Sequence, residues 1–209
     1  MAQAPTNHQE EWRDRVLKYA LEEFLKHGIK NVKMDDIAAS LQMSKRTLYE
    51  MFEDKEHLLI ESIRLQHSEN RRKIETITKN AENPLEMFAG IFNLRLKETR
   101  SVNPKFISEL NRYESIRRGF EKEKRDRNSK TLRFIEECVK LGLFRDDINY
   151  TLLVRMMDSC LETMMEQEIY KDFPIDEIYY TLYETMLRSI CTQKGREILD
   201  KSIKKINKS

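Results

Sequence analysis

Apolar residues recur every three or four positions through most of the chain, which is the spacing of helices that bury one face. The first such stripe predicts a helix over about residues 10–27 and consists of Trp12, Val16, Ala20 and Phe24. Gly28 follows this stripe, and its permissive backbone suits the place where a helix ends.

Capping residues and proline mark where further helices begin. Ser44 and Asp54 carry side chains that accept hydrogen bonds from the first amides of a helix, and Asn83-Pro84-Leu85-Glu86 has the order of an N-cap, a first-turn proline and a third-position carboxylate. The helices predicted after the first one cover about residues 34–41, 45–52, 55–80, 84–100, 104–110, 114–141, 147 or 149–170, 174–191 and 195–206.

Composition agrees with a helical chain. Only five glycines and four prolines occur among 209 residues, so turns are few and elements are long. Lys, Glu, Leu, Met and Arg, which favour helices, are abundant. Because hydrophobic residues make up 39% of the chain, a buried core is available, and we expect an all-α fold.

Charge neither requires nor excludes a nucleic-acid partner. Charged residues make up 35% of the chain but the formal net charge is +2, so any basic surface has to be local. Three widely spaced cysteines, Cys138, Cys160 and Cys191, argue against a disulfide framework or a zinc site and fit a reducing cytosol. The chain has neither an apolar leader nor an 18-residue apolar run, so we expect a cytoplasmic location and no membrane partner.

The residues carry no catalytic signature. The four histidines lack metal-ligand spacing, and the motifs GxSxG, GxGxxG, HExxH and the P-loop do not occur. Carboxylate pairs such as Asp146-Asp147 stand at helix starts, where capping accounts for them. We therefore expect no enzymatic activity, no metal and no cofactor.

The stretch from Met34 to Leu59 predicts two short helices joined by a tight turn and followed by a long helix. The second short helix begins with basic and hydroxyl-bearing residues, while Leu48 and Phe52 stand four residues apart on what would be its other face. A DNA-recognition helix needs this division, because its first turn reaches base edges while its back packs against the protein. Arg46 can donate two hydrogen bonds to a guanine edge.

The same pattern also fits a solvated helix face. The first 55 residues hold nine Lys or Arg against ten Asp or Glu, so the segment as a whole is not basic. Short helix-turn-helix segments occur in many all-α folds. The pattern alone therefore leaves open a DNA-binding regulator, a helical protein-interaction module, and a ligand-binding protein without DNA readout.

Across about residues 10–60 the sequence closely resembles the DNA-binding domain of the TetR/AcrR family of transcription regulators. The resemblance rests on Phe24 and Gly28 at the end of the first helix, on the pair Ile37-Ala38, and on a run from Met43 to Leu59 that is similar to vSkrTLYeyF.dKe.Ll. The resemblance implies a three-helix DNA-binding head followed by a C-terminal helical bundle.

The resemblance also implies which residues contact DNA. Lys33 stands where the family has a capping Thr, which weakens that cap, and Met51 replaces a His or Tyr that contacts the DNA backbone. Gln42 replaces a turn glycine, so we expect it to take a positive φ. The implied DNA-binding residues are Lys33, Ser44, Lys45, Arg46, Thr47, Tyr49 and Lys55.

Two late helices carry apolar surfaces that are wider than a single core-facing stripe, which indicates a second partner. Two such helices from each of two chains would form a four-helix interface with two-fold symmetry. The alternative is a deep core within one chain. The residues expected at a dimer interface are Met164, Met165, Tyr179, Leu182, Tyr183, Met186, Leu187 and Ile190.

Methionine and aromatic side chains also mark candidates for a ligand pocket, because such side chains line adaptable apolar cavities. The same stripes fit plain core packing. The candidates are Phe88, Phe92, Leu96, Phe106, Tyr113, Phe120, Phe134, Met156, Met157 and Cys160.

These observations give one expected organisation. Residues 1–9 would form a disordered tail, 10–57 a helix-turn-helix DNA-binding domain, and 58–209 a domain for ligand binding and dimerisation. The expected function is that of a sequence-specific transcription regulator, a repressor that a small-molecule ligand releases from a palindromic operator. Its partners would be double-stranded DNA, a second copy of the chain and an unidentified small-molecule effector.

Overall fold

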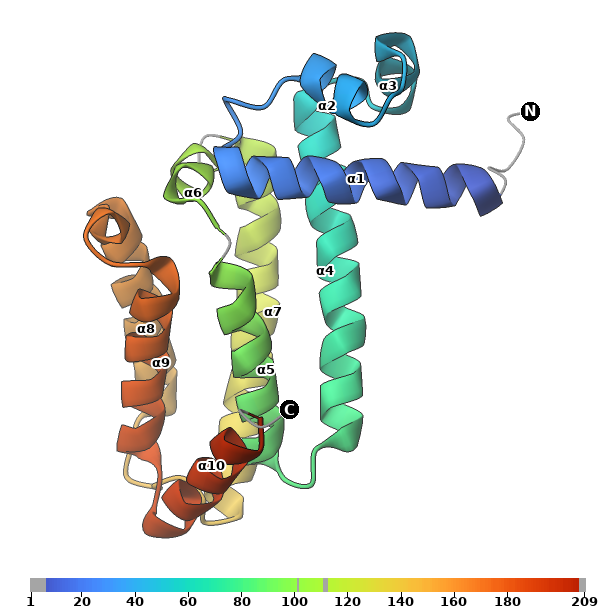
Figure 1. The fold of residues 1–209 in the computed structure, drawn as a ribbon. Helices are drawn as coiled ribbons and strands as arrows, with labels where there is room; N and C mark the ends of the chain where they lie inside the picture. Colours follow the sequence, from blue (N-terminus) through green and yellow to red (C-terminus); the bar gives the residue numbers. More distant parts are fainter. Residues whose placement is uncertain (1–6, 101, 111–112, 207–209) are drawn as a thin grey trace. The chain divides into compact units, whose positions relative to one another are not determined.

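The computed structural model describes residues 7–100, 102–110 and 113–206 of the chain (Figure 1). These residues form α-helices and one 3-10 turn, Ile169–Lys171, with a single isolated β-bridge, so the all-α prediction is confirmed. The helices are α1 (Asn7–His27), α2 (Met34–Ser40), α3 (Lys45–Met51), α4 (Lys55–Asn80), α5 (Pro84–Thr99), α6 (Pro104–Leu110), α7 (Glu114–Lys140), α8 (Tyr150–Glu166), α9 (Ile175–Ile190) and α10 (Gln193–Ile206).

The chain divides into two compact units whose borders differ from the expected division after residue 57. The first unit consists of Met1–Lys73 and Val102–Arg117, and the second of Ile74–Ser101 and Arg118–Ser209. The difference has a simple origin, because α4 is one uninterrupted helix and passes from one unit into the other. Of the tail expected over residues 1–9, residues 1–6 lie outside the described part, and α1 already begins at Asn7.

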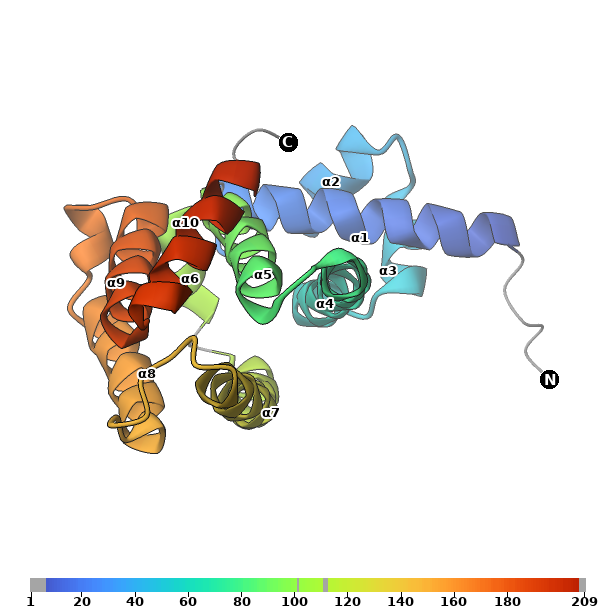
Figure 2. The same cartoon turned by 90° about the horizontal axis from the view of Figure 1, so that it is seen from below.

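Four helices enclose the core of the first unit. α1 crosses the first part of α4, and Figure 2 views α4 nearly along its axis. Two ion pairs join these helices, Arg13–Glu61 at 3.3 Å and Lys18–Glu69 at 2.7 Å. Each fully buried Leu or Phe contributes about 1.5–3 kcal/mol to stability. The buried apolar side chains include Val16, Ala20, Phe24, Ile37, Ala38, Leu48, Phe52, Leu58 and Leu59.

Polar contacts tie the segment around α6 to the end of α1. The backbone N–H of Asn103 donates to the Leu25 carbonyl at 2.7 Å, and its side-chain amide donates to the Lys26 carbonyl at 2.9 Å. Glu109 Oε2 accepts a hydrogen bond from the Lys30 N–H at 2.8 Å. The last carbonyls of a helix have no partner within the helix, so these contacts explain why residues 102–117 join the first unit.

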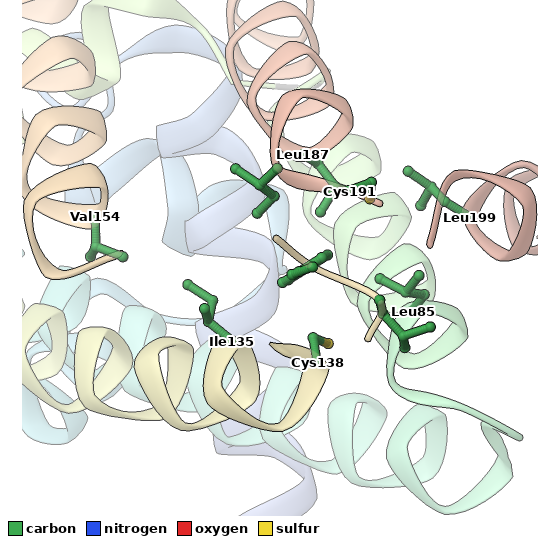
Figure 3. Packing of buried hydrophobic residues seen from close by; sticks show 10 residues of the cluster. Leu85, Ile135, Cys138, Val154, Leu187, Cys191 and Leu199 are labelled. Atoms are coloured by element: carbon green, nitrogen blue, oxygen red, sulfur yellow. The ribbon is translucent and has the colours of Figure 1, made fainter. Parts of the chain in front are cut away.

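The second unit has its own core, to which α5, α7, α8, α9 and α10 all contribute (Figure 3). Cys138 and Cys191 are buried there as free thiols. Burial raises the pKa of Cys138 to about 12 and that of Cys191 to about 11, so neither thiol ionises at neutral pH. The cluster consists of Leu85, Ile135, Cys138, Leu143, Phe144, Val154, Leu187, Ile190, Cys191 and Leu199.

Two segments that are distant in sequence pair beside this core. The Arg145 N–H donates to the Ile190 carbonyl at 2.9 Å, and the Thr192 N–H donates to the Leu143 carbonyl at 3.0 Å. The Thr192 hydroxyl donates to the Gly142 carbonyl at 2.8 Å and accepts from the Gly195 N–H at 3.1 Å. Thr192 therefore caps α10, which is why this helix begins at Gln193 and not at the expected residue 195.

The expected caps at two other helix starts are confirmed. Asp54 accepts a hydrogen bond from the His57 N–H at 2.7 Å, and Asn83 accepts one from the Glu86 N–H at 2.9 Å. The helix expected to continue to residue 170 instead ends at Glu166, because Glu168 adopts a left-handed φ of 55° that interrupts it. In the described part of the chain, no helix combines the length and apolar character needed to cross a membrane.

Gly195 provides a test of the packing in the second unit. A Cβ at this position would lie 2.1 Å from the Leu143 carbonyl oxygen, a backbone atom that cannot turn away. We expect Gly195→Ala to lower the free energy of unfolding by about 1–3 kcal/mol, as overpacking does. At an open helix position the same change would stabilise. Denaturant unfolding followed by circular dichroism measures the effect, with Gln193→Ala as an exposed control; a Gly195→Ala variant as stable as the wild type would contradict this packing.

Candidate nucleic-acid interface

The turn between α2 and α3 is tight and slightly strained. Gln42 has a φ of 54°, as its replacement of a turn glycine predicted, and such backbone costs a residue with a Cβ about 1 kcal/mol. The Met43 N–H donates to the Ala38 carbonyl at 2.9 Å, which closes the turn against the end of α2. These bonds fix the direction in which the chain enters α3.

The helix α3 has one buried face and one exposed face. The side chains of Leu48 and Phe52 are fully buried in the core of the first unit. The residues of the first turn are exposed, and Tyr49 on the next turn is 48% exposed. Because the side chains at 45, 46 and 49 face away from the protein that anchors Leu48, this surface is available to a partner.

The first turn of α3 is organised by its cap. The Ser44 side-chain oxygen accepts a hydrogen bond from the Thr47 N–H at 3.0 Å, which confirms the cap predicted from sequence. The two hydroxyl oxygens of Ser44 and Thr47 also lie 2.7 Å apart and share a hydrogen bond. At the start of α2, by contrast, Lys33 makes no side-chain capping bond, and the weak cap predicted there is confirmed.

Both cations of this first turn have carboxylate partners within the unit. Lys45 Nζ lies 2.5 Å from Asp35 Oδ2 on α2, and Arg46 Nε lies 2.8 Å from Glu50 Oε1 one turn further along α3. The hydrogen bond to Asp35, followed by the attraction between the two charges, raises the pKa of Lys45 above its ordinary value. The side chains of Lys45, Arg46 and Glu50 are largely exposed and that of Asp35 is half-buried, so a phosphate or a base edge can compete for the cations.

Lys55 differs from the other predicted DNA-contacting residues because its ammonium group bonds to backbone carbonyls of the loop between α1 and α2. Lys55 Nζ donates to the Ile29 carbonyl at 2.9 Å and to the Val32 carbonyl at 3.1 Å. An ammonium group has three N–H donors, so one remains for a phosphate. Lys55 therefore fastens the loop between α1 and α2, a role that the sequence did not indicate because it depends on where that loop lies.

Comparison with known proteins connects this geometry to a family. Residues 16–61, which contain α2, the turn and α3, match the family model described as "Bacterial regulatory proteins, tetR family". This segment of the chain is therefore similar to the DNA-binding part of the tetR family. The proteins that this family model describes are bacterial regulatory proteins. No curated protein matched the chain.

Several solved structures share the TetR-family fold over most of both chains. A putative transcriptional regulator from Saccharomonospora viridis, solved in complex with choline, has 20% sequence identity and a TM-score of 0.72, and the match covers 88% of this chain and 100% of that one. A TetR-family transcriptional regulator from Marinobacter aquaeolei VT8 has 19% identity and a TM-score of 0.66, with 92% and 97% covered. The ketosteroid transcriptional regulator KstR2 of Mycobacterium tuberculosis has 18% identity and a TM-score of 0.61, with 91% and 98% covered. The helical body behind the head is therefore part of a known architecture.

In the second unit, some of the pocket candidates form a stacked aromatic cluster. The Phe92 ring lies 5.6 Å from the Tyr179 ring, and the Phe88 ring lies 5.7 Å from the Phe134 ring. Leu96, Met157 and Cys160 are half-buried in the same unit. These rings contact one another directly, so a ligand would have to separate them to enter between them.

The remaining pocket candidates lie elsewhere. Phe106 and Tyr113 belong to the first unit, where Phe106 is buried and burial raises the pKa of Tyr113. The side chain of Phe120 lies outside the described residues. Met156 is 58% exposed and lines an open surface groove on α8, so it does not lie inside an enclosed pocket.

The residues expected at a dimer interface also divide into groups. Leu187 and Ile190 are buried in the core of their own chain, so they are not available to a second copy. Tyr179 stacks on Phe92, the Tyr183 ring is tilted against the same ring, and burial raises the pKa of both phenols. The half-buried members of the expected set are Met164, Met165, Leu182 and Met186.

The residues expected at a dimer interface do not include the apolar side chains that are most exposed on α8 and α9, and Met156 was expected in a pocket instead. Leu152 is 54% exposed, Met156 58% and Tyr180 46%. On α8, Leu152, Met156, Cys160 and Met164 follow one another at intervals of four, and all four line the surface groove. This spacing was visible in the sequence, but a helix with two apolar faces does not show which face meets its own core.

The strained turn generates the first prediction for the head. Glycine adopts a positive φ without steric cost, so we expect Gln42→Gly to raise the free energy of unfolding by about 0.5–1 kcal/mol. Thermal unfolding would show a melting temperature higher by about 1–4 °C. Ala39→Gly, which places the same residue at an exposed position within α2, serves as the control and should destabilise. A loss of stability in Gln42→Gly would show that the turn carries no such strain.

The ion pair between Lys45 and Asp35, which joins α3 to α2, generates a second prediction for this unit. Asp35→Asn releases Lys45 for phosphate contacts, so affinity for a random-sequence duplex should rise about 2- to 5-fold. The slope of log K against log salt should steepen by about 0.9, the value for one more phosphate contact. Fluorescence anisotropy at several salt concentrations measures both quantities.

A matched control separates this local effect from the change in net charge. Glu69→Gln removes the same charge from a comparable pair with Lys18. Glu69 lies on α4 about 21 Å from Lys55 at the helix start, by the rise of 1.5 Å per residue. If both variants gained affinity equally, the Lys45–Asp35 pair would have no special role.

Proposed function

We propose that this chain is a transcription regulator of the TetR type that binds a palindromic operator as a homodimer, represses transcription there and dissociates when a small-molecule ligand binds its helical body. The exposed first turn of α3, anchored from behind by Leu48 and Phe52, is the observation that supports DNA reading most directly. A recognition helix uses its N-terminal residues to contact base edges in the major groove.

The proposed DNA-binding surface consists of side chains with complementary tasks. Arg46 and Thr47 have donors and a methyl group that suit base edges, while Tyr49, Ser44 and Lys45 suit phosphates. Lys33 is exposed at the start of α2 and can reach a phosphate through its long side chain. Lys55 contributes chiefly by holding the loop between α1 and α2, with one N–H left for the DNA backbone.

Dimerisation is supported by the apolar surface of α8. Leu152 and Met156 are more than half exposed, and they border a groove that also includes Cys160 and Met164. An exposed apolar surface of this kind is a common place for a second chain to pack. A dimer with two-fold symmetry would present two copies of α3 to successive major grooves, with half-sites about 34–36 Å apart.

Effector binding is supported by the aromatic residues of the second unit. One similar structure was solved in complex with choline, so a protein with this fold can hold a small molecule. In this chain the stacked rings of Phe88, Phe92 and Tyr179 offer apolar surface that a ligand could cover by displacing one ring. A coupling of about 1–3 kcal/mol between ligand and operator would change DNA affinity about 5- to 150-fold.

Selection of bound fragments from a random DNA pool tests this proposal. The wild-type chain should select a palindrome, and the double variant Arg46→Ala plus Tyr49→Ala should lose at least about 100-fold in operator affinity while keeping its helical circular dichroism spectrum. A control with Arg133→Ala plus Phe173→Ala removes an exposed arginine and an exposed aromatic residue from the second unit and should bind normally. Unchanged operator binding by the double variant would overturn this reading of α3.

A further inference from the structure

Arg46 and Glu50 form an ion pair on the exposed side of α3. Arg46 Nε donates to Glu50 Oε1 at 2.8 Å, and the side chains are 89% and 60% exposed. Glu50 was not among the residues that the sequence marked for DNA binding. A pair four residues apart on a helix is often only a surface contact that adds slightly to helix stability.

The orientation of this pair argues against a purely stabilising role. The positive end of a helix dipole lies at the N-terminus, where a cation is unfavourable, and the negative end lies at the C-terminus, where an anion is unfavourable. Arg46 is the second residue of α3 and Glu50 is the last but one. Both charges therefore oppose the dipole, and exchanging them would stabilise the helix more.

The contact leaves the guanidinium group in a defined state. A guanidinium is planar and has five N–H donors, of which one belongs to Nε. With Nε bonded to Glu50, the four N–H groups at the end of the side chain remain, and two of them can donate side by side to O6 and N7 of a guanine. Lys45, held by Asp35, offers only a rotating ammonium group without this planar geometry.

We infer that Glu50 is a positioning residue that aims Arg46 at one guanine in each half-site and so determines specificity there. This inference rests on the proposed DNA-binding function and adds a residue to it. Glu50 fixes the plane of the guanidinium group before DNA arrives, which reduces the ordering that binding requires. The Glu50 carboxylate also weakens contacts of Arg46 with phosphates. The arginine therefore favours a guanine edge, whose O6 and N7 accept hydrogen bonds from the terminal nitrogens of the guanidinium group.

The test measures base preference at the selected guanine. The wild-type chain should prefer guanine to the other bases by about 5- to 150-fold at that position. Glu50→Ala should reduce this preference to less than about 3-fold, while Glu50→Gln should retain most of it because its amide oxygen still accepts from Arg46 Nε. Glu53→Ala, which removes an exposed carboxylate just beyond α3, should leave the preference unchanged. Competition binding against operators altered at this base pair gives the numbers.

A double-variant cycle shows whether Glu50 acts through Arg46. In the Arg46→Ala background, Glu50→Ala should change base preference by less than about 2-fold, because the residue that it aims is gone. A change in preference there would mean that Glu50 reads a base itself and would overturn the inference. A full guanine preference in the Glu50→Ala single variant, with only its melting temperature altered, would overturn it equally. If the wild-type chain selects no sequence at all, the proposed function fails instead.

Discussion

The surface of α3 depends on how Leu48 and Phe52 are held from behind. Both side chains are fully buried, and the Phe52 ring lies against Arg13 of α1 and His57 of α4, so α3 has a single rotational setting about its own axis. With about 100° between successive residues, that setting places 45, 46 and 49 on the exposed side. A seven-residue helix is too short to be stable alone, so tertiary packing and the Ser44 cap supply its stability. The chemistry of the exposed side therefore follows from the packing of the hidden one.

Electrostatics on this surface favours discrimination over strong general attraction. The first 55 residues contain nearly equal numbers of cationic and anionic side chains, and Lys45 and Arg46 both contact carboxylates of the same unit. Affinity for any DNA grows with the number of phosphates that free cations can neutralise, and here Lys45 has to leave Asp35 first while Glu50 weakens the attraction of Arg46 to phosphates. A DNA-binding surface of this kind gains less affinity from random DNA. At a matching site, base contacts have to offset the free energy of separating the cation from its carboxylate.

The sequence predicted local features of the fold well because they depend on neighbouring residues. The caps at Ser44 and Asp54 and the positive φ of Gln42 each involve contacts within four residues, which a linear pattern contains. Contacts between helices could not be predicted in this way. The bond from Lys55 to the loop after α1 and the pair between Lys45 and Asp35 depend on the angles at which helices cross.

The body shows the same division between local pattern and packing. Its helices were predicted from apolar spacing, but Leu187 and Ile190 face their own core while Leu152 and Met156 face outward. The spacing of apolar residues shows that each helix has two apolar faces. It does not show which of the two packs against the core of the same chain. Because the core of the second unit is complete with Leu187 and Ile190 inside, the apolar residues left on α8 are surplus to the folding of one chain. Such a surplus is costly in water unless another surface covers it, and two-fold pairing of α8 is the simplest way for one sequence to provide that surface.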